Sequence, residues 1–376
     1  MRKIREIIGL AGTAWCLLGV SLLIVVAFEL MLRGVFFAKD TWIDGPVGEY
    51  STPWASDFWR EYSVLGTERR SYVEWRRKPF QGKQVNIDSN GIRRTWTGPE
   101  TSSKESSHPY RIFVFGGSTV WGTGARDEAT IPSFLAKHLV AKGLSVEVVN
   151  FGETGYVTTQ ELVTLILCLQ RGDLPDLVVF YDGLNDAFST FQNHVAGRPQ
   201  YVEIHRVKLN LNLYLGQFSS DFAGLDRLAK GVNRRLERRK ATVREDKAPP
   251  TNEVALASDT IRVYEQNLRL IQSLADAYGF KCQFFWQPVV FTKHHLTEFE
   301  SRAAGDMEFY RSFCLEVYRQ AAASEFLAQQ GRFHNISSIF DETSEQCYLD
   351  FAHVTEEANE MIAKDMEVYL APEIKR

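Results

Sequence analysis

Residues 111–121 read RIFVFGGSTVW, and this stretch decides the fold class. The apolar run 112–115 is typical of a buried strand. Gly116 and Gly117 allow the backbone to turn sharply after that strand, because glycine has no Cβ. The turn places Ser118 at the start of a helix, where backbone N–H groups lie close to its hydroxyl. We therefore predict a strand, a tight turn and a helix, with Ser118 at the carboxyl end of the strand.

Further apolar runs of strand length follow along the chain. They lie at 146–149, 177–181, 282–286 and, more weakly, 333–336. Helical patterns separate them, since apolar residues recur at i, i+3 and i+4 spacing within 131–139 and 261–274. Apolar strands that alternate with helices indicate a parallel sheet covered by helices on both faces. Ligands bind such sheets beyond the carboxyl ends of the strands, so the segments after each strand are the candidate functional segments.

Three later segments carry residues suited to acyl transfer. They are 150–155 (NFGETG), 183–186 (GLND) and 350–353 (DFAH). A serine hydroxyl is a weak nucleophile that needs an adjacent base, and an imidazole titrates near neutrality and can accept its proton. The spacing of Asp350 and His353 lets one short loop hold both side chains, with the carboxylate fixing the imidazole tautomer.

Together these blocks resemble the SGNH/GDSL hydrolase family over about residues 110–370. Residues 116–118 match its nucleophile block, with Gly117 where the family name has Asp. The other three family blocks match 150–155, 183–186 and 350–353. The resemblance implies an α/β fold with three α/β/α layers, flavodoxin-like, around a central parallel sheet. It implies no cofactor and no metal.

The resemblance also implies roles for individual residues. Ser118 is the expected nucleophile, His353 the base and Asp350 its orienting partner. Three N–H groups are the expected oxyanion-hole donors: those of the Ser118 backbone, the Gly155 backbone and the Asn185 amide. Within the second block, family spacing favours Gly155 over Gly152, which is then a turn glycine.

The N-terminal stretch predicts a membrane anchor. Residues 7–28 are 22 residues without a charge, and a helix of that length spans about 33 Å, against about 30 Å of hydrocarbon core. A cleaved signal peptide is the alternative, but 27–30 (AFEL) is a poor cleavage site. The basic residues before the run favour a cytoplasmic N-terminus: Arg2, Lys3 and Arg5. The rest of the chain is then expected to be extracytoplasmic, facing the periplasm from a bacterial inner membrane.

The expected organisation has three parts. Residues 1–39 form a cytoplasmic tip and transmembrane anchor, 40–108 an irregular extension and linker, and 109–376 the hydrolase-like domain. The extension is rich in Trp and Arg, for which aromatic packing with solvated arginines is favoured over a sugar or lipid-headgroup site. An insertion at about 190–255 contains 226–247, with a net charge of +5. It is interpreted as a solvated surface segment, with a lid or an anion-binding role as alternatives.

Composition and spacing exclude other classes of protein. A net charge of −4 with 44% hydrophobic and 12% aromatic residues is atypical of a disordered chain or a general nucleic-acid binder. His294 and His295 have no third metal ligand at a recognisable spacing. Asp182 and Asp186 are expected to shape the loop around Asn185. Buried thiols and one disulfide remain alternatives for the cysteines outside the anchor: Cys168, Cys282, Cys314 and Cys347.

The expected function is that of a serine esterase acting through an acyl-Ser118 intermediate. Its expected partners are an ester-bearing glycan or lipid of the cell envelope, and the membrane through one N-terminal helix, with no nucleic acid. Two alternatives stay open. One is an O-acyltransferase with the same triad, and the other is a non-catalytic envelope protein that binds glycan or assists assembly.

Overall fold

A computed structural model of the protein describes residues 15, 19–21, 23–28, 31, 52–98, 108–200 and 252–374. Its central sheet has five parallel strands: β5 (Tyr110–Gly116), β6 (Val146–Asn150), β7 (Leu177–Asp182), β8 (Lys281–Trp286) and β9 (Phe333–Asn335). The spatial order β6-β5-β7-β8-β9 is that of a flavodoxin-like sheet. The predicted parallel α/β sheet is therefore confirmed.

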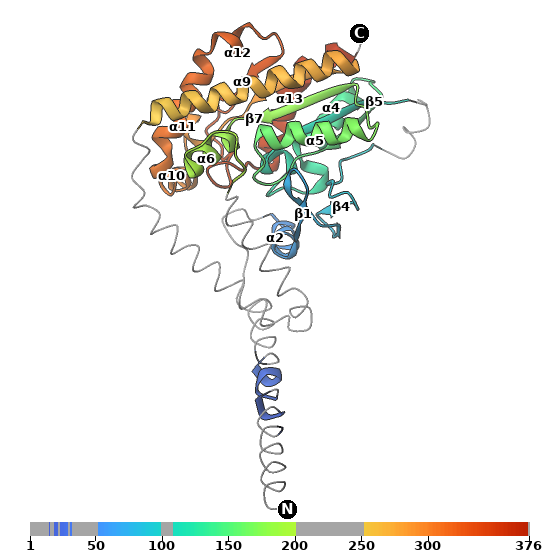
Figure 1. Ribbon diagram of the computed structural model, residues 1–376, viewed down its shortest axis with the longest axis vertical. Helices are drawn as coiled ribbons and strands as arrows, with labels where there is room; N and C mark the ends of the chain where they lie inside the picture. The colour runs from blue at the N-terminus through green and yellow to red at the C-terminus, as the bar shows by residue number, and fades with distance from the viewer. Residues whose placement is uncertain are drawn as a thin grey trace, which may run out of the picture. The chain divides into compact units, whose positions relative to one another are not determined.

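Helices cover both faces of this sheet (Figure 1). On one face, α4 (Ile131–Ala141) packs against α13 (Glu356–Ile374). On the other face, α9 (Glu253–Tyr278) packs against both α5 (Thr158–Gln170) and α11 (Glu308–Ala323). Shorter helices connect these elements: α3 (Ser118–Trp121), η2 (Asp127–Ala129), α6 (Leu184–Asn193), η3 (Val290–Thr292), α10 (Glu298–Gly305) and α12 (Glu325–Gln329).

The core lies between the sheet and its helical layers, and aromatic rings of neighbouring strands stack within it. The ring centroids of Phe115 and Phe180 are 4.9 Å apart, and those of Phe180 and Phe284 are 5.7 Å apart. All three rings are fully buried, and burial of each stabilises the fold by about 1.5–3 kcal/mol. The strand order reverses between β5 and β7. Ligands bind such sheets beyond the carboxyl ends of the strands at this point, so the segments after β5 and β7 are the candidate site segments.

Residues 52–98 hold more regular structure than the irregular extension predicted from the sequence. They form α2 (Ala55–Val64) and two hairpins, β1 (Thr67–Arg70) with β2 (Glu74–Arg77) and β3 (Phe80–Gln81) with β4 (Asn86–Ile87). Strands of two to four residues are too short to leave a periodic pattern. The expectation of solvated arginines is also wrong for Arg76 and Arg77, which are buried, and Arg93 of the same segment is buried as well.

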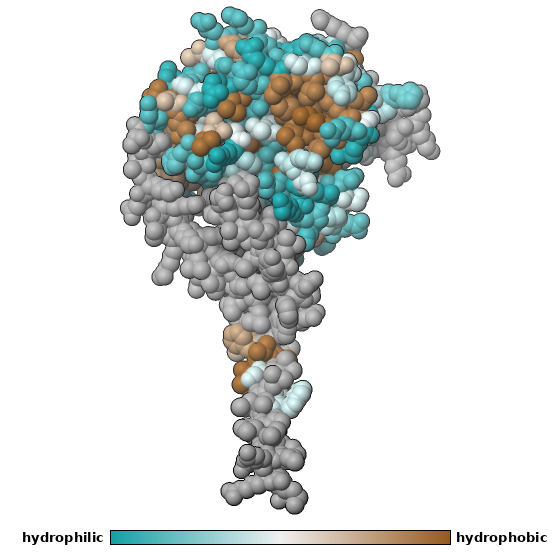
Figure 2. Space-filling view, in the orientation of Figure 1, coloured by the Kyte–Doolittle hydropathy of each residue, from teal (hydrophilic) through white to brown (hydrophobic). Residues whose placement is uncertain are grey.

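Most of the predicted anchor, residues 7–28, lies outside the described residues. The few described residues of this stretch are helical, and their apolar side chains are exposed, with Leu23 at 69% and Ile24 at 63% (Figure 2). In the part of the chain that is described, no helix combines the length and the apolar character needed to cross a bilayer. Residues 201–251, most of the predicted insertion, are also outside the described ranges.

Candidate active site

The fold brings Ser118, Asp350 and His353 together at the carboxyl end of the sheet. The Nε2 atom of His353 lies 2.8 Å from Ser118 Oγ, and its Nδ1 atom lies 2.6 Å from Asp350 Oδ2. The other Asp350 oxygen accepts hydrogen bonds from the backbone N–H groups of Ala352 and His353, at 2.8 and 2.7 Å. Because the ionised carboxylate only accepts, Nδ1 carries the proton and Nε2 can accept the proton of Ser118.

Ser118 occupies the predicted position in the strand–turn–helix segment. It follows β5 after Gly116 and Gly117, and it is the first residue of α3. The helix closes through the bonds Trp121 N–H to Gly117 O, at 3.0 Å, and Gly122 N–H to Ser118 O, at 2.9 Å. The N–H of a first helical residue has no partner within the helix, so the Ser118 N–H is available beside its own hydroxyl.

Asn185 begins α6 with Leu184, directly after β7, and two hydrogen bonds define the orientation of its amide. Its Nδ2 donates to Tyr156 O at 2.7 Å, and its Oδ1 accepts from Gln200 Nε2 at 3.1 Å. A Cβ atom on residue 117 would lie 2.0 Å from Asn185 Nδ2. Gly117 therefore leaves the space in which this amide lies, which gives a physical reason for Gly in place of the Asp of the family name.

Gly155 lies in the loop between β6 and α5, with a φ angle of +77°. A Cβ atom there would be 3.3 Å from Gln200 Oε1 and 3.5 Å from the Trp75 ring. Within the described part of the chain, the Gly155 N–H donates to no backbone carbonyl. At Gly152 a Cβ atom would lie 2.4 Å from Trp121 N, so this glycine permits close packing between the loop and α3.

The charges at the site suit a base that works near neutral pH. Burial lowers the pKa of His353, but the charge and hydrogen bond of Asp350 raise it more, so its net pKa lies above the ordinary 6.5. Burial raises the pKa of Asp350, but the His353 charge and the hydrogen bonds that the carboxylate accepts lower it more, so its net pKa is below its usual value. The pair therefore combines a carboxylate whose pKa is lowered with an imidazole whose pKa is raised, because each stabilises the charged form of the other.

A pH profile tests this pairing. We expect kcat/KM to fall about tenfold per pH unit below the pKa of His353, because only neutral imidazole can accept the Ser118 proton. The raised pKa places this acidic limb above pH 6.5. Asp350→Asn removes the charge that raises the pKa, so its limb, relative to its own plateau, should move to lower pH. Rates on a neutral ester measure both profiles, and an unshifted midpoint in Asp350→Asn would contradict the assignment.

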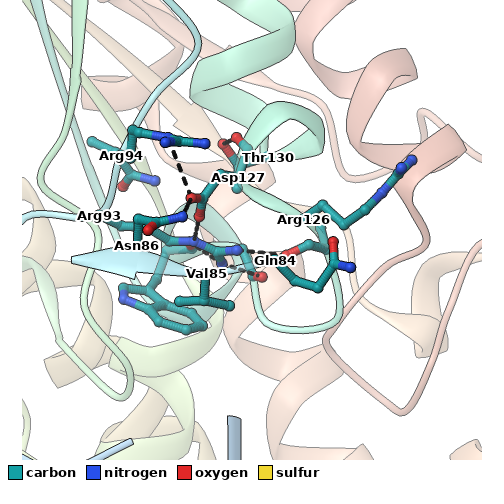
Figure 3. A network of polar contacts seen from close by, with 12 residues as sticks. Gln84, Val85, Asn86, Arg93, Arg94, Arg126, Asp127 and Thr130 are labelled. Carbon is teal, nitrogen blue, oxygen red and sulfur yellow. Dashed lines mark hydrogen bonds and ion pairs between the residues drawn. The ribbon is translucent and has the colours of Figure 1, made fainter. Parts of the chain in front are cut away.

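Arg93 holds the C-terminal end of the short helix that Ser118 begins, and Figure 3 shows this arginine beside Asp127. Its Nη1 donates to the carbonyls of Trp121, at 2.9 Å, and Gly122, at 2.6 Å, and its Nη2 to that of Ala125, at 2.6 Å. Its Nε donates to Asp127 Oδ1 at 3.0 Å. The guanidinium is fully buried and lies 4.4 Å from the centroid of the Trp121 ring. Residues 52–98 therefore fix α3, the helix that Ser118 begins, through the buried guanidinium of Arg93.

Asp182 and Asp186 are buried on either side of Asn185. Asp186, in the first turn of α6, accepts hydrogen bonds from the backbone N–H and the hydroxyl of Thr158, the latter at 2.8 Å. These bonds join the start of α6 to the start of α5. Burial raises the pKa of Asp186 to about 6 and that of Asp182 to about 8, and it also raises the pKa of the neighbouring Glu161. These contacts agree with the predicted role of Asp186 in shaping the loop.

The remaining candidate residues do not join the site. The four cysteines outside the predicted anchor are buried free thiols rather than a disulfide: Cys168, Cys282, Cys314 and Cys347. His294 is exposed and lies 3.4 Å from Asp341. Among the described residues, no three or more His, Cys, Asp or Glu side chains are grouped to hold a metal ion.

Sequence reasoning missed three residues that contact the site. Gln200 holds the Asn185 amide, Arg93 holds α3, and Glu153 is fully buried in the Gly155 loop. Glu153 lies between Gly152 and Gly155 in the block 150–155, and this position could have marked it as a residue near the site. Gln200 and Arg93 carry no local signal, because their partners are distant in the chain.

A family model and several solved structures are similar to this chain. The family model described as GDSL-like lipase/acylhydrolase matches residues 112–366. Similar solved structures include a member of the lipolytic protein G-D-S-L family from Veillonella parvula DSM 2008, at 13% identity, covering 69% of this chain and 98% of that chain with a TM-score of 0.37. The acetyl xylan esterase AlAXEase is 14% identical, with 69% and 99% covered and a TM-score of 0.35.

Est24, a carbohydrate acetylesterase from Sinorhizobium meliloti, is 11% identical, with 70% and 98% covered and a TM-score of 0.37. No curated protein sequence matches the chain significantly. Identities and TM-scores of this size do not identify a substrate. The family model, in contrast, spans more than half of the chain and contains Ser118, Asn185 and His353. The chain therefore belongs to the GDSL-like lipase/acylhydrolase family and is an ester-hydrolysing enzyme.

Proposed function

We propose that the chain is a serine esterase in which Ser118 attacks the ester carbonyl, His353 is the base and Asp350 orients it. The hydrogen-bonded line from Asp350 through His353 to Ser118 Oγ is the observation that supports this function. His353 takes the Ser118 proton and passes it to the leaving alcohol. Water then gives its proton to His353, attacks the acyl-Ser118 intermediate and releases the carboxylic acid, and the proton returns to Ser118.

Three donors are proposed to stabilise the oxyanion of each tetrahedral intermediate: the Ser118 N–H, the Gly155 N–H and the Asn185 amide. The position of Ser118 at the start of α3 supports the first donor. The Gly155 N–H has no backbone acceptor among the described residues, which supports the second. Asn185 Nδ2 carries two hydrogens and uses one for Tyr156 O, which leaves the other for an oxyanion.

We prefer O-acyl groups on an envelope polysaccharide as the substrate. Ser118, Gly155 and Asn185 are all half-buried, which leaves the site open to a bulky polymer. The amide of Gln200, beside Gly155 and Asn185, offers hydrogen bonds to sugar hydroxyls. A lipid ester is the competing substrate. An acyltransferase with the same residues would differ in its acceptor, a sugar hydroxyl in place of water.

A substrate panel tests this proposal with the full chain in detergent. We expect hydrolysis of O-acetylated glycans and short-chain p-nitrophenyl esters, with lower rates on long acyl chains and none in Ser118→Ala. Mass spectrometry of an added oligosaccharide acceptor detects acyl transfer, and a product acylated in preference to hydrolysis would favour the transferase. A fluorophosphonate that labels Ser118 no faster than it labels the denatured chain would contradict an activated serine.

We also propose that residues 7–28 anchor the chain in a membrane with its catalytic part in the periplasm or outside. The basic residues before the apolar stretch, and the exposed apolar side chains of its described part, support this location. The chain should remain with membranes after a carbonate wash. A reporter fused after Arg376 that is active only in the cytoplasm would overturn the orientation.

A further inference from the structure

The hairpin β1–β2 lies against the loop that carries Gly155, although it precedes the residues matched by the family model. The Trp75 indole Nε1 donates to Thr154 O at 2.9 Å. The Tyr156 hydroxyl donates to Trp75 O, and Gln160 Nε2 donates to Val73 O at 2.8 Å. Three hydrogen bonds, one donated by the hairpin and two accepted by it, thus join the loop and α5 to β2 and the turn before it.

The buried carboxylate of Glu153 joins the same two segments. One of its oxygens accepts the Arg77 N–H at 2.8 Å, and the other accepts the N–H and hydroxyl of Thr154, at 2.8 and 3.2 Å. The guanidinium groups of Arg77 and Arg76 lie 3.6 and 4.0 Å from it. A fully buried carboxylate is tolerated only with such partners, so the loop and the hairpin are held in one arrangement.

The bond from Trp75 acts on one particular peptide group. The carbonyl of Thr154 and the N–H of Gly155 belong to the same planar trans peptide and point in opposite directions. A donor that holds the Thr154 carbonyl therefore also sets the direction of the Gly155 N–H. Gly155 itself could not fix this direction, because a glycine at a φ of +77° has wide conformational freedom.

We propose that Trp75 is a positioning residue of the active site, whose indole N–H holds the Thr154 carbonyl and so aims the Gly155 N–H at the oxyanion. Glu153 holds the Thr154 N–H and thereby fixes the preceding peptide of the loop. The inference rests on the proposed oxyanion role of Gly155. By this inference the hairpin β1–β2 contributes to catalysis, although it lies outside the residues that the family model matches.

The test uses Trp75→Phe, which keeps an aromatic ring in the hairpin and removes the N–H donor together with one ring of the buried indole. We expect kcat to fall about 10-fold to 100-fold, since a misplacement of about 1 Å can lower a rate 10²-fold. KM should stay within about twofold to threefold, because the oxyanion forms only in the transition state. The rate of Ser118 phosphonylation should fall by a similar factor, because the phosphonate oxygen occupies the same hole.

Gln160→Met is the matched control. It removes the hydrogen bond from α5 to the same hairpin, and the bond that the Gln160 side chain accepts from the Val157 N–H, without touching the peptide of Thr154 and Gly155. We expect it to keep kcat near the wild-type value at a comparable loss of thermal stability. Equal losses of kcat in Gln160→Met and Trp75→Phe would overturn the positioning role, because hairpin docking alone would then explain both. A raised KM with unchanged kcat in Trp75→Phe would also overturn it, since the ring would then bind substrate.

Asn185→Ala, measured in parallel, distinguishes a failure of the Trp75 inference from a failure of the proposed oxyanion hole. If it lowers kcat while folded Trp75→Phe does not, the oxyanion hole stands and the inference on Trp75 fails. If neither variant lowers kcat, the proposed oxyanion function itself fails. Should Trp75→Phe not fold, Trp75→Met tests the same bond, because methionine lacks the N–H donor and its flexible side chain can fill the space of the indole. A folded Trp75→Met with wild-type kcat would then overturn the inference, and a lower kcat at unchanged KM would support it.

Discussion

Ser118→Ala should lower kcat by about 10⁶-fold, and His353→Ala should lower it by a similar factor. Ser118 Oγ is the atom that lies 2.8 Å from the imidazole of His353. Without it no acyl-enzyme forms, and without the imidazole the hydroxyl keeps its proton. The activity left in each variant would come from the oxyanion donors and substrate binding alone. Initial rates on a p-nitrophenyl ester measure kcat, and thermal melts establish that both variants remain folded.

The double variant gives the sharper result. Ser118→Ala with His353→Ala should be little worse than either change alone, because the two side chains perform one proton transfer. His138→Ala is the matched control, since His138 lies in α4 and faces Glu360 at 3.9 Å, away from the triad. It should retain wild-type kcat. Independent, multiplicative losses from Ser118 and His353 would show that they do not act as nucleophile and base.

Gly117→Ala and Asn185→Ala should each lower kcat by about 10²–10³-fold, the usual effect of one lost oxyanion donor. Asn185→Ala removes the amide directly. Gly117→Ala places a Cβ atom 2.0 Å from Asn185 Nδ2, so the amide must move away. The displaced atom is the end of a side chain that can rotate, so we expect the fold to survive. KM should change much less than kcat, because the oxyanion develops in the transition state.

A double-variant cycle connects these two residues. The combined variant should be little worse than Asn185→Ala alone, because both changes remove the same donor. Gly305→Ala is a matched control, since a Cβ atom at the end of α10 would meet nothing within 4 Å. Wild-type kcat in a folded Gly117→Ala would mean that the amide does not act from the position described. Multiplicative losses would mean that residue 117 acts by another route.

The sequence alone predicts the sheet and the nucleophile turn. The apolar runs at 112–115 and 177–181 are continuous because both faces of a parallel sheet are buried, so their composition reports their environment directly. Gly116 and Gly117 before Ser118 mark a turn by local backbone requirements alone. The pairing of Asp350 with His353 also follows from local spacing, since one short loop carries both residues. These are features whose cause lies within a few residues of chain.

Only the tertiary structure decided which arginines are buried and which residues contact the loop that carries Gly155. Arg77 and Arg93 read as surface residues in the sequence, yet both are buried, because Glu153 and Asp127 lie beside them after folding. The contact of Trp75 with Thr154 joins positions 79 residues apart. A local sequence pattern cannot predict such a contact, because the indole N–H and the Thr154 carbonyl become neighbours only after the chain has folded. The sequence by itself therefore determined the sheet, the nucleophile turn and the spacing of Asp350 and His353, and only the tertiary structure placed the hairpin β1–β2 against the loop that carries Gly155.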